Sequence, residues 1–154
     1  MPSLVDVYAY RIHKNEPAFL LLKRSDKVIY AGEWRMIGGK INELEPAWKA
    51  ALRELSEETG LQPKTAWCVP SVNSFFEFKS NTLHHIPVFS VELEHDSKIE
   101  LNHEHSEYGW FSPEEAQTLL LWPEQKRLLS LISSILRENR LSKEWIIPNS
   151  YRHL

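Results

Sequence analysis

The sequence predicts an α+β domain with a sandwich-like α/β/α arrangement. Segments with strand character stand on both sides of one strongly patterned helix over residues 46–59, and helical patterns return only after residue 112. Strands around a central helix, followed by terminal helices, bury their apolar faces best when helices cover a sheet.

The strands are expected where apolar and β-branched runs end in turn residues. A turn at residues 14–17 separates the first two runs, and residues 24–32 connect the second run to a short third one that leads to Gly38 and Gly39. Two long runs follow the central helix, and a short run precedes the terminal helices. The predicted strands are residues 4–12, 18–23, 34–37, 65–78, 86–94 and 108–111.

The helices after residue 112 begin at typical start signals. A hydroxyl, a proline and two acids occupy residues 112–115, which predicts a short helix to about Leu121. Pro123 introduces a second helix, over about residues 124–139, with apolar side chains on one side. The pattern of residues 141–154 leaves their structure undetermined.

The central helix carries the residues that point to chemistry. Pro46 is expected at its first position. At about 100° per residue, Glu54, Glu57 and Glu58 fall on one arc that is roughly 100° wide, beside a mostly apolar stripe. Arg53 stands four residues before Glu57, so it can pair with that carboxylate.

Three carboxylates on one arc repel one another and raise one another's pKa unless a cation neutralises them. Oxygen ligands with no cysteine among them favour Mg²⁺ or Mn²⁺. A solvated acidic helix face is the alternative interpretation of such a cluster.

The spacing around the cluster favours the metal site. Gly39 is followed after five residues by Glu45, and after seven more by the run RELSEETGL, which starts at Arg53. This run and its spacing agree at every position with the Nudix box: a glycine, five residues, Glu, seven residues, then Arg-Glu-apolar-x-Glu-Glu-x-Gly-apolar. At average residue usage, chance gives this pattern in fewer than about one chain in a million. The chain therefore resembles a Nudix hydrolase, and its order of elements resembles the Nudix fold, a mixed sheet between helices.

This resemblance implies a role for each box residue. In Nudix hydrolases the box forms a loop, a helix and a loop whose glutamates bind magnesium, and the substrate is a nucleoside diphosphate linked to another group. Such hydrolysis needs a cation to neutralise phosphate charge and to activate water. By position, the implied metal ligands are Glu54, Glu57, Glu58 and the carbonyl of Gly39, with Glu45 as an outer acid. The implied catalytic residues in the box are Glu57, Glu58 and Arg53, which orients a glutamate.

A second, narrower resemblance lies downstream of the box. Residues 104–110, EHSEYGW, with Glu115-Ala116, Leu119 and Trp122 after them, are similar to the nucleoside triphosphate pyrophosphohydrolase branch that includes dihydroneopterin triphosphate pyrophosphatase. In that branch a glutamate outside the box reaches the metals as ligand or general base. The resemblance assigns this role to Glu104. A solvated loop acid is the alternative, and Glu107 takes the role if the loop register differs by three residues.

Candidate substrate-binding residues lie outside both motifs. Arg24 follows a strand and is placed to meet phosphates. Trp34, Phe75 and Trp122 can stack on a base, although aromatic residues at strand ends are more often core residues. The pairs His84-His85 and His103-x-His105 suggest a metal site, but the oxygen ligands of Nudix magnesium sites disfavour this interpretation.

Composition sets the remaining expectations. A chain of 154 residues with 42% hydrophobic content predicts one domain over residues 1–154. The net charge of −3 gives no electrostatic reason for nucleic-acid binding. Without a signal-peptide pattern or an apolar run of membrane-spanning length, we expect a cytoplasmic protein. Cys68, the sole cysteine, excludes an internal disulfide and is expected to be buried.

These observations predict an enzyme that depends on Mg²⁺, or on Mn²⁺ in its place. Its expected reaction cleaves a nucleoside triphosphate-like substrate, a (d)NTP or dihydroneopterin triphosphate, to a monophosphate and pyrophosphate. A hydrolase of a sugar nucleotide or dinucleoside polyphosphate is the alternative. A non-catalytic Nudix ligand sensor is disfavoured by the intact box and by the lack of length for a DNA-binding domain. The expected partner is a small nucleotide-like molecule, without nucleic acid or membrane, for a monomer or homodimer.

Overall fold

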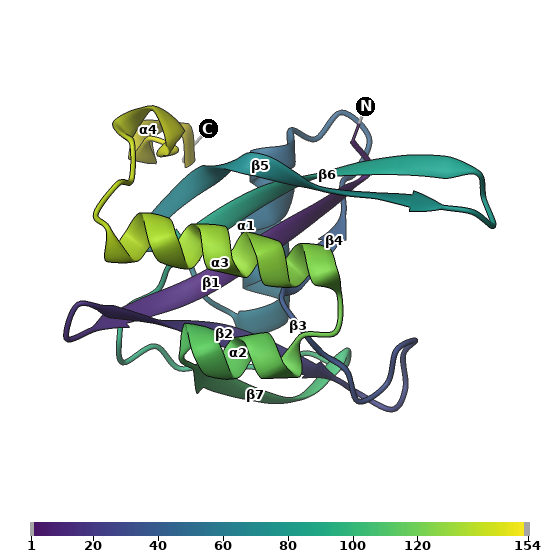
Figure 1. The fold of residues 1–154 in the computed structure, drawn as a ribbon, viewed down its shortest axis with the longest axis horizontal. Helices are drawn as coiled ribbons and strands as arrows, with labels where there is room; N and C mark the ends of the chain where they lie inside the picture. Colours follow the sequence, from purple (N-terminus) through teal and green to yellow (C-terminus); the bar gives the residue numbers. More distant parts are fainter. Residues whose placement is uncertain (1, 153–154) are drawn as a thin grey trace.

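The computed structural model describes residues 2–152 and has a seven-stranded mixed sheet with helices on both faces (Figure 1). The predicted α+β class is confirmed. The strands are β1 (Leu4–His13), β2 (Glu16–Arg24), β3 (Trp34–Arg35), β4 (Ile37–Lys40), β5 (Thr65–Glu77), β6 (Thr82–Glu92) and β7 (His105–Phe111). The helices are α1 (Ala47–Thr59), α2 (Pro113–Leu119), α3 (Pro123–Arg137), the 3₁₀ turn η1 (Lys143–Trp145) and α4 (Asn149–Arg152).

Strand β1 organises the sheet, because its two halves have different partners. The strand order is β3-β2-β1-β6-β5, while β4 pairs with the first half of β1 and β7 pairs with β2. The β1–β6 pair is parallel and the other pairs are antiparallel. In the β1–β4 pair Val5 lies opposite Gly39. This pairing anchors the loop before α1 at the middle of the sheet.

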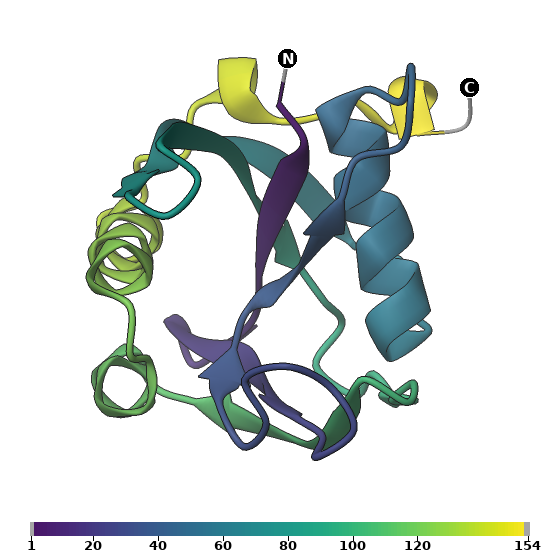
Figure 2. The ribbon, with the colours of Figure 1, turned by 90° about the vertical axis from the view of Figure 1, so that its right-hand side faces the viewer.

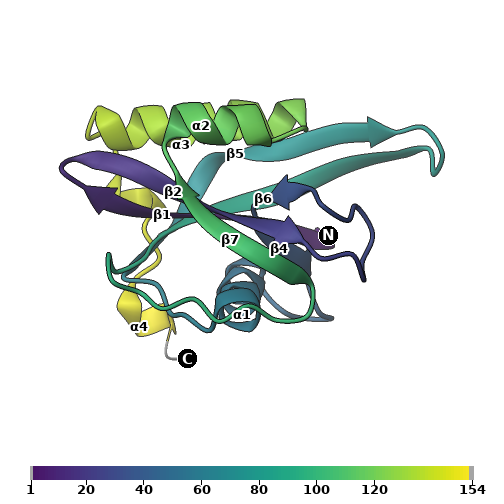
Figure 3. The ribbon, with the colours of Figure 1, turned by 90° about the horizontal axis from the view of Figure 1, so that it is seen from below.

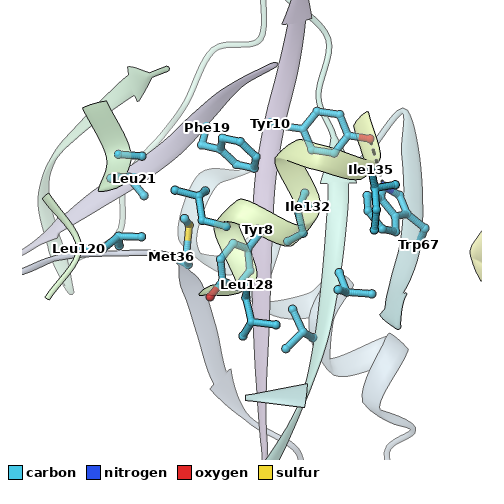
Figure 4. Packing of buried hydrophobic residues seen from close by; sticks show 14 residues of the cluster. Tyr8, Tyr10, Phe19, Leu21, Met36, Trp67, Leu120, Leu128, Ile132 and Ile135 are labelled. Carbon is cyan, nitrogen blue, oxygen red and sulfur yellow. Dashed lines mark hydrogen bonds between the residues drawn. The ribbon is translucent and has the colours of Figure 1, made fainter. Parts of the chain in front are cut away.

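The two faces of the sheet have separate cores. Successive side chains of a strand point to opposite faces, so Val5 and Val7 of β1 pack towards α1, while Tyr8 and Tyr10 pack towards α3. Figure 2 shows α1 on one side of the sheet and α2 and α3 on the other. In the α3-side core, Trp67 donates a hydrogen bond from its indole nitrogen to the Tyr10 hydroxyl over 3.0 Å (Figure 4).

The segment after α3, undetermined from the sequence, runs along the edge of β5. The Trp145 ring stacks on Trp67 with ring centroids 6.3 Å apart, and the Ile147 amide donates to the Ala66 carbonyl over 2.8 Å. The segment therefore covers an edge strand and the indole beneath it. Among residues 2–152 no helix combines the length and the apolar character that crossing a membrane requires.

Several predicted element boundaries differ from the structure. Helix α1 begins at Ala47, and Pro46 is its N-cap in an extended conformation. The single strand predicted over residues 34–37 is two strands that break at Met36, and Gly38 and Gly39 lie inside β4. The break lets β3 pair with β2 while β4 pairs with β1.

Pairing partners also extend two strands beyond their apolar runs. Strand β6 starts at Thr82 because it forms a hairpin with β5 that extends beyond the other strands (Figure 3). Strand β7 starts at His105, not Tyr108, because it pairs with β2 as far as Arg24. The expectation for Cys68 is wrong: this residue of β5 is exposed.

Candidate active site

The acids of α1 meet the glycines of β4. A Cβ atom at Gly39 would overlap the carboxylate of Glu54, so a side chain there would displace this acid. The amide of Gly38 donates to Oε2 of Glu58 over 3.2 Å. Glycine at residue 39 therefore permits the close approach of strand and helix that brings the backbone next to two carboxylates.

Glu58 is the most deeply buried acid of the group. Its side chain is 3% exposed, and burial, followed by the charges of Glu54 and Glu104, raises its pKa to about 9. Burial also raises the pKa of Glu54, and the charge of Glu57 adds to this effect. The protein thus holds two carboxyls in places that oppose their ionisation.

Arg53 ties the loop before α1 to the helix. Its guanidinium donates to both carboxylate oxygens of Glu45 over 2.9 Å, and to the Lys40 carbonyl over 2.7 Å. It also contacts Glu54 at 3.1 Å and Glu57 at 3.2 Å. The contact with Glu57 is the one that their four-residue spacing predicts. Hydrogen bonding to Arg53 lowers the pKa of Glu45.

The loop before β7 brings Glu104 to the same site. The side chain of Asn102 donates to the Glu57 carbonyl over 3.2 Å and accepts from the Glu104 amide over 3.0 Å. The amide of Ser25 donates to the Glu104 carbonyl over 2.8 Å. The carboxylate of Glu104 lies 3.7 Å from the guanidinium of Arg24. Asn102 was not anticipated, although asparagine side chains in loops typically bond the backbone two residues further on.

Glu107, the sequence alternative to Glu104, lies elsewhere. Its carboxylate pairs with Nζ of Lys23 over 3.1 Å on the exposed side of the β2–β7 pair. Glu104, in contrast, belongs to a group with Glu58 and His105 whose ligand atoms all lie within 4.8 Å of one another. The loop register therefore brings Glu104 to the acids of α1.

His105 is a buried member of this group. Its Nε2 lies 3.8 Å from Oε1 of Glu58, and its Nδ1 is buried without a hydrogen-bond partner. Burial, followed by the charge of Arg24, lowers the pKa of His105 to about 4, so the ring is neutral near pH 7. The sequence suggested a pair with His103, but His103 is exposed.

The donor chemistry of this group fits a divalent cation. Carboxylates whose pKa values are raised by burial and by one another bind a cation that favours their charged forms. Glu58 and Glu104 supply oxygen atoms, with Glu54 next to Gly39 at the same end of the site. Glu57 is 52% exposed and is held by Arg53 at the outer side. Oxygen-rich sites of this kind suit Mg²⁺ and Mn²⁺.

The aromatic candidates are spread over three places. Trp122 is 44% exposed and donates from its indole nitrogen to Glu33 over 3.0 Å. Phe75 is 41% exposed on the β5–β6 hairpin, where it stacks on His84. Trp34 packs against the α3-side core. Of the four substrate-binding candidates, Arg24 is the one in contact with the acidic group.

Comparison with known proteins shows the family to which this chain belongs. The profile of the NUDIX domain matches residues 2–132. CTP pyrophosphohydrolase of Escherichia coli K12 is 31% identical over 135 residues, which cover 86% of this chain and 94% of that protein. Oxidized purine nucleoside triphosphate hydrolase of Mus musculus is 31% identical over 118 residues, which cover 76% of this chain and 73% of that protein.

Solved structures show the same fold. The dihydroneopterin triphosphate pyrophosphohydrolase of E. coli superimposes with a TM-score of 0.72 at 21% identity, over 86% of this chain and 95% of that chain. Nudix hydrolases use divalent metals and act on small nucleotide substrates. The chain belongs to the NUDIX domain family and is a hydrolase that acts on phosphoanhydride bonds of nucleotide derivatives.

Proposed function

We propose that this enzyme is a Mg²⁺-dependent pyrophosphohydrolase that cleaves a nucleoside triphosphate-like substrate to a monophosphate and pyrophosphate. The observation that carries the proposal is the convergence of Glu58, Glu104 and the Gly39–Glu54 contact at one end of α1. Two relatives at 31% identity, named for hydrolysis of CTP and of oxidized purine nucleoside triphosphates, support the substrate class. The candidate substrates are (d)NTPs and dihydroneopterin triphosphate.

The metal ligands in this proposal are carboxylates from two elements. A bound Mg²⁺ supplies charge neutralisation of the phosphates and lowers the pKa of the attacking water. Glu54, Glu57 and Glu58 would hold it from α1 and Glu104 from the loop, with the Gly39 carbonyl as a further ligand. Mn²⁺ takes the same oxygen donors.

Arg53 and Arg24 have different tasks at the site. Arg53 holds Glu54 and Glu57 in place through contacts of 3.1 and 3.2 Å. Arg24 lies beside Glu104 with its side chain partly exposed, so its guanidinium can contact a phosphate oxygen when the substrate binds. As the alternative to its ligand role, Glu104 would act as the general base that accepts a proton from the attacking water.

The substrate's ring system needs a platform away from the acids. Trp122 is our first choice because its indole is 44% exposed and is fixed by the hydrogen bond to Glu33. Phe75 is the second choice, since its exposed ring lies on the protruding hairpin. Aromatic rings provide such stacking surfaces. Trp34 remains a weaker candidate because it contacts the core.

A substrate panel tests the proposal. The purified protein is incubated with Mg²⁺ and with (d)NTPs, dihydroneopterin triphosphate, ADP-ribose, sugar nucleotides or dinucleoside polyphosphates, and the products are separated and identified. We expect the highest kcat/KM with a triphosphate and release of pyrophosphate. Preference for a sugar nucleotide or a dinucleoside polyphosphate would support the alternative substrate class. Binding without turnover of any compound would support a sensor and contradict catalysis.

The metal requirement needs its own control. Activity is measured after chelation and again after addition of Mg²⁺, Mn²⁺ or Ca²⁺. Chelation is expected to abolish turnover, and Mg²⁺ or Mn²⁺ is expected to restore it. Turnover that survives chelation would contradict the proposed metal dependence.

A further inference from the structure

His105 lies beside the proposed metal ligands but takes no part in the function proposed above. Its imidazole is buried, with a side chain that is 1% exposed. Its backbone is fixed on two sides, since the residue pairs with Arg24 in the β2–β7 ladder and its amide donates to the Asn102 carbonyl over 3.4 Å. The ring therefore has a defined place against Glu58.

The distance of 3.8 Å between Nε2 and Oε1 of Glu58 allows two roles. It exceeds the normal length of a hydrogen bond, and it falls within the span of two atoms that bind one metal ion. In the first role Nε2 carries the proton and directs it to Glu58. In the second role Nε2 is unprotonated and binds the metal directly.

The surroundings of Nδ1 favour the first role. Direct metal binding through Nε2 puts the proton of the neutral ring on Nδ1, where it would be a buried donor without an acceptor. A ligating histidine almost always donates its other N–H to a partner. With the proton on Nε2, the unpaired Nδ1 is an acceptor. The Nε2–H donor then faces the carboxylate of Glu58. Unpaired buried acceptors are more common than unpaired buried N–H groups.

We propose that His105 is a positioning residue that orients Glu58 for metal binding. The amide of Gly38 holds Oε2 of Glu58 from β4, and the imidazole faces Oε1 from β7. The carboxylate of Glu58 then lies between the two strands, within 4.8 Å of a carboxylate oxygen of Glu104. This inference rests on the proposed metal role of Glu58.

Two variants of His105 and one control test the role. His105→Gln keeps an N–H donor at nearly the same distance from the backbone, whereas His105→Leu fills the space without a donor. His103→Leu changes an exposed histidine two residues away. Mn²⁺ binding is measured without substrate from the EPR signal of free Mn²⁺, and kcat and KM are measured with Mg²⁺.

We expect His105→Leu to weaken Mn²⁺ binding by about 10- to 100-fold, the usual effect of losing an outer partner of a ligand. Its kcat should fall while KM for the substrate changes little. His105→Gln should recover most of both losses, and His103→Leu should behave as the unchanged protein. Melting temperatures of all variants exclude unfolding as the cause.

Three results would overturn the proposal. If His105 only fills space, His105→Leu will bind Mn²⁺ normally and His105→Gln will be the more damaged variant. Nitrogen couplings from a directly bound imidazole in the pulsed EPR spectrum of the Mn²⁺-loaded protein, absent in His105→Leu, would show that His105 is a ligand. If His105→Leu and His105→Gln lose Mn²⁺ affinity and kcat equally at unchanged melting temperature, His105 does not act as an N–H donor. A Glu58→Gln variant with normal Mn²⁺ binding would instead refute the proposed role of Glu58.

Discussion

Helix α1 and the loop before it carry acids in two opposite situations. Around Arg53, the carboxylates of Glu45 and Glu57 have a cation of the protein as partner, and the pKa of Glu45 is lowered. At the inner side, Glu58 is buried beside other acids, and its pKa is raised to about 9. Glutamate thus has a cationic partner in the first place and like-charged neighbours in the second.

This difference separates acids that are paired within the protein from acids whose burial is uncompensated. A paired carboxylate contributes to the fold, while a buried carboxylate among like charges costs stability that an added cation can recover. The Arg53 region thus secures the loop before α1, and the Glu58 region is where, under the proposed function, a metal would recover the cost of burying like charges. Substitutions of Glu58, Glu104 and Arg53 test whether the paired and the buried acids differ in this way.

The largest expected effect is on catalysis in Glu58→Gln. Because the buried ligand loses its charge, we expect kcat to fall by at least about 100-fold, or roughly 3 kcal/mol of transition-state stabilisation. Glu57→Gln should also lower kcat. Steady-state kinetics at saturating Mg²⁺ measure both, with circular dichroism to confirm folding. Full activity in Glu58→Gln would refute our central assignment.

The next effect separates the two acids of the β7 region. Glu104→Gln should lower kcat by about 10- to 100-fold with little change in KM, because the lost ligand or base acts mainly in the transition state. Glu107→Gln should be mild, since Glu107 pairs with Lys23 on the surface. The two variants are compared in the same assay, and a reversed ranking would mean that Glu107 is the functional acid.

Substitution of Arg53 should affect stability and activity together. Arg53→Lys keeps the charge but loses the fork that contacts Glu45, the Lys40 carbonyl, Glu54 and Glu57 at once. We expect a lower melting temperature and a kcat reduced by about tenfold, since outer partners of metal ligands have effects of this size. Thermal melts and kinetics measure the two. A normal melt with normal kcat would show that the contacts are dispensable.

The smallest effect concerns the metal-free protein at different pH. Burial raises the pKa of Glu58 from its ordinary value of 4.5 to about 9 on folding, so between these values the native state binds a proton that the unfolded state releases. Stability therefore falls as pH rises from about 4.5 to about 9. Glu58→Gln should weaken this pH dependence and raise the melting temperature at pH 8. Identical melting curves of both proteins across this range would contradict the burial effect.

The Nudix box could be recognised from the sequence because its residues lie close together along the chain. The spacing from Gly39 to Glu58 lies within one strand, one loop and one helix, so helical periodicity alone brings the acids together. The residue pair Arg53 and Glu57 was predictable for the same reason. Glu104 required the resemblance to known enzymes, since nothing local relates it to α1.

Other features depend on pairing between distant segments. The place of His105 is set by the register of β7 against β2, which shifts between Lys23 and Arg24. The break at Met36 arises because β3 and β4 pair with different strands. Cys68 was expected inside but is exposed on β5, next to the irregularity between Cys68 and Val72 in its pairing with β6. Sequence periodicity does not report which strands meet, so these features could not be predicted.

The parallel pairing of β1 with β6 has a consequence for how the chain reaches its native state. Asp6 of β1 lies opposite Val88 of β6, so the central ladder cannot form until most of the chain is available. During synthesis, α1 emerges while the strand that completes its binding surface on the sheet is still missing. Contacts between such distant segments slow folding. We therefore expect the Glu58 carboxylate to remain exposed to solvent in early folding species and to become buried only after the sheet has brought Gly38 and His105 against it.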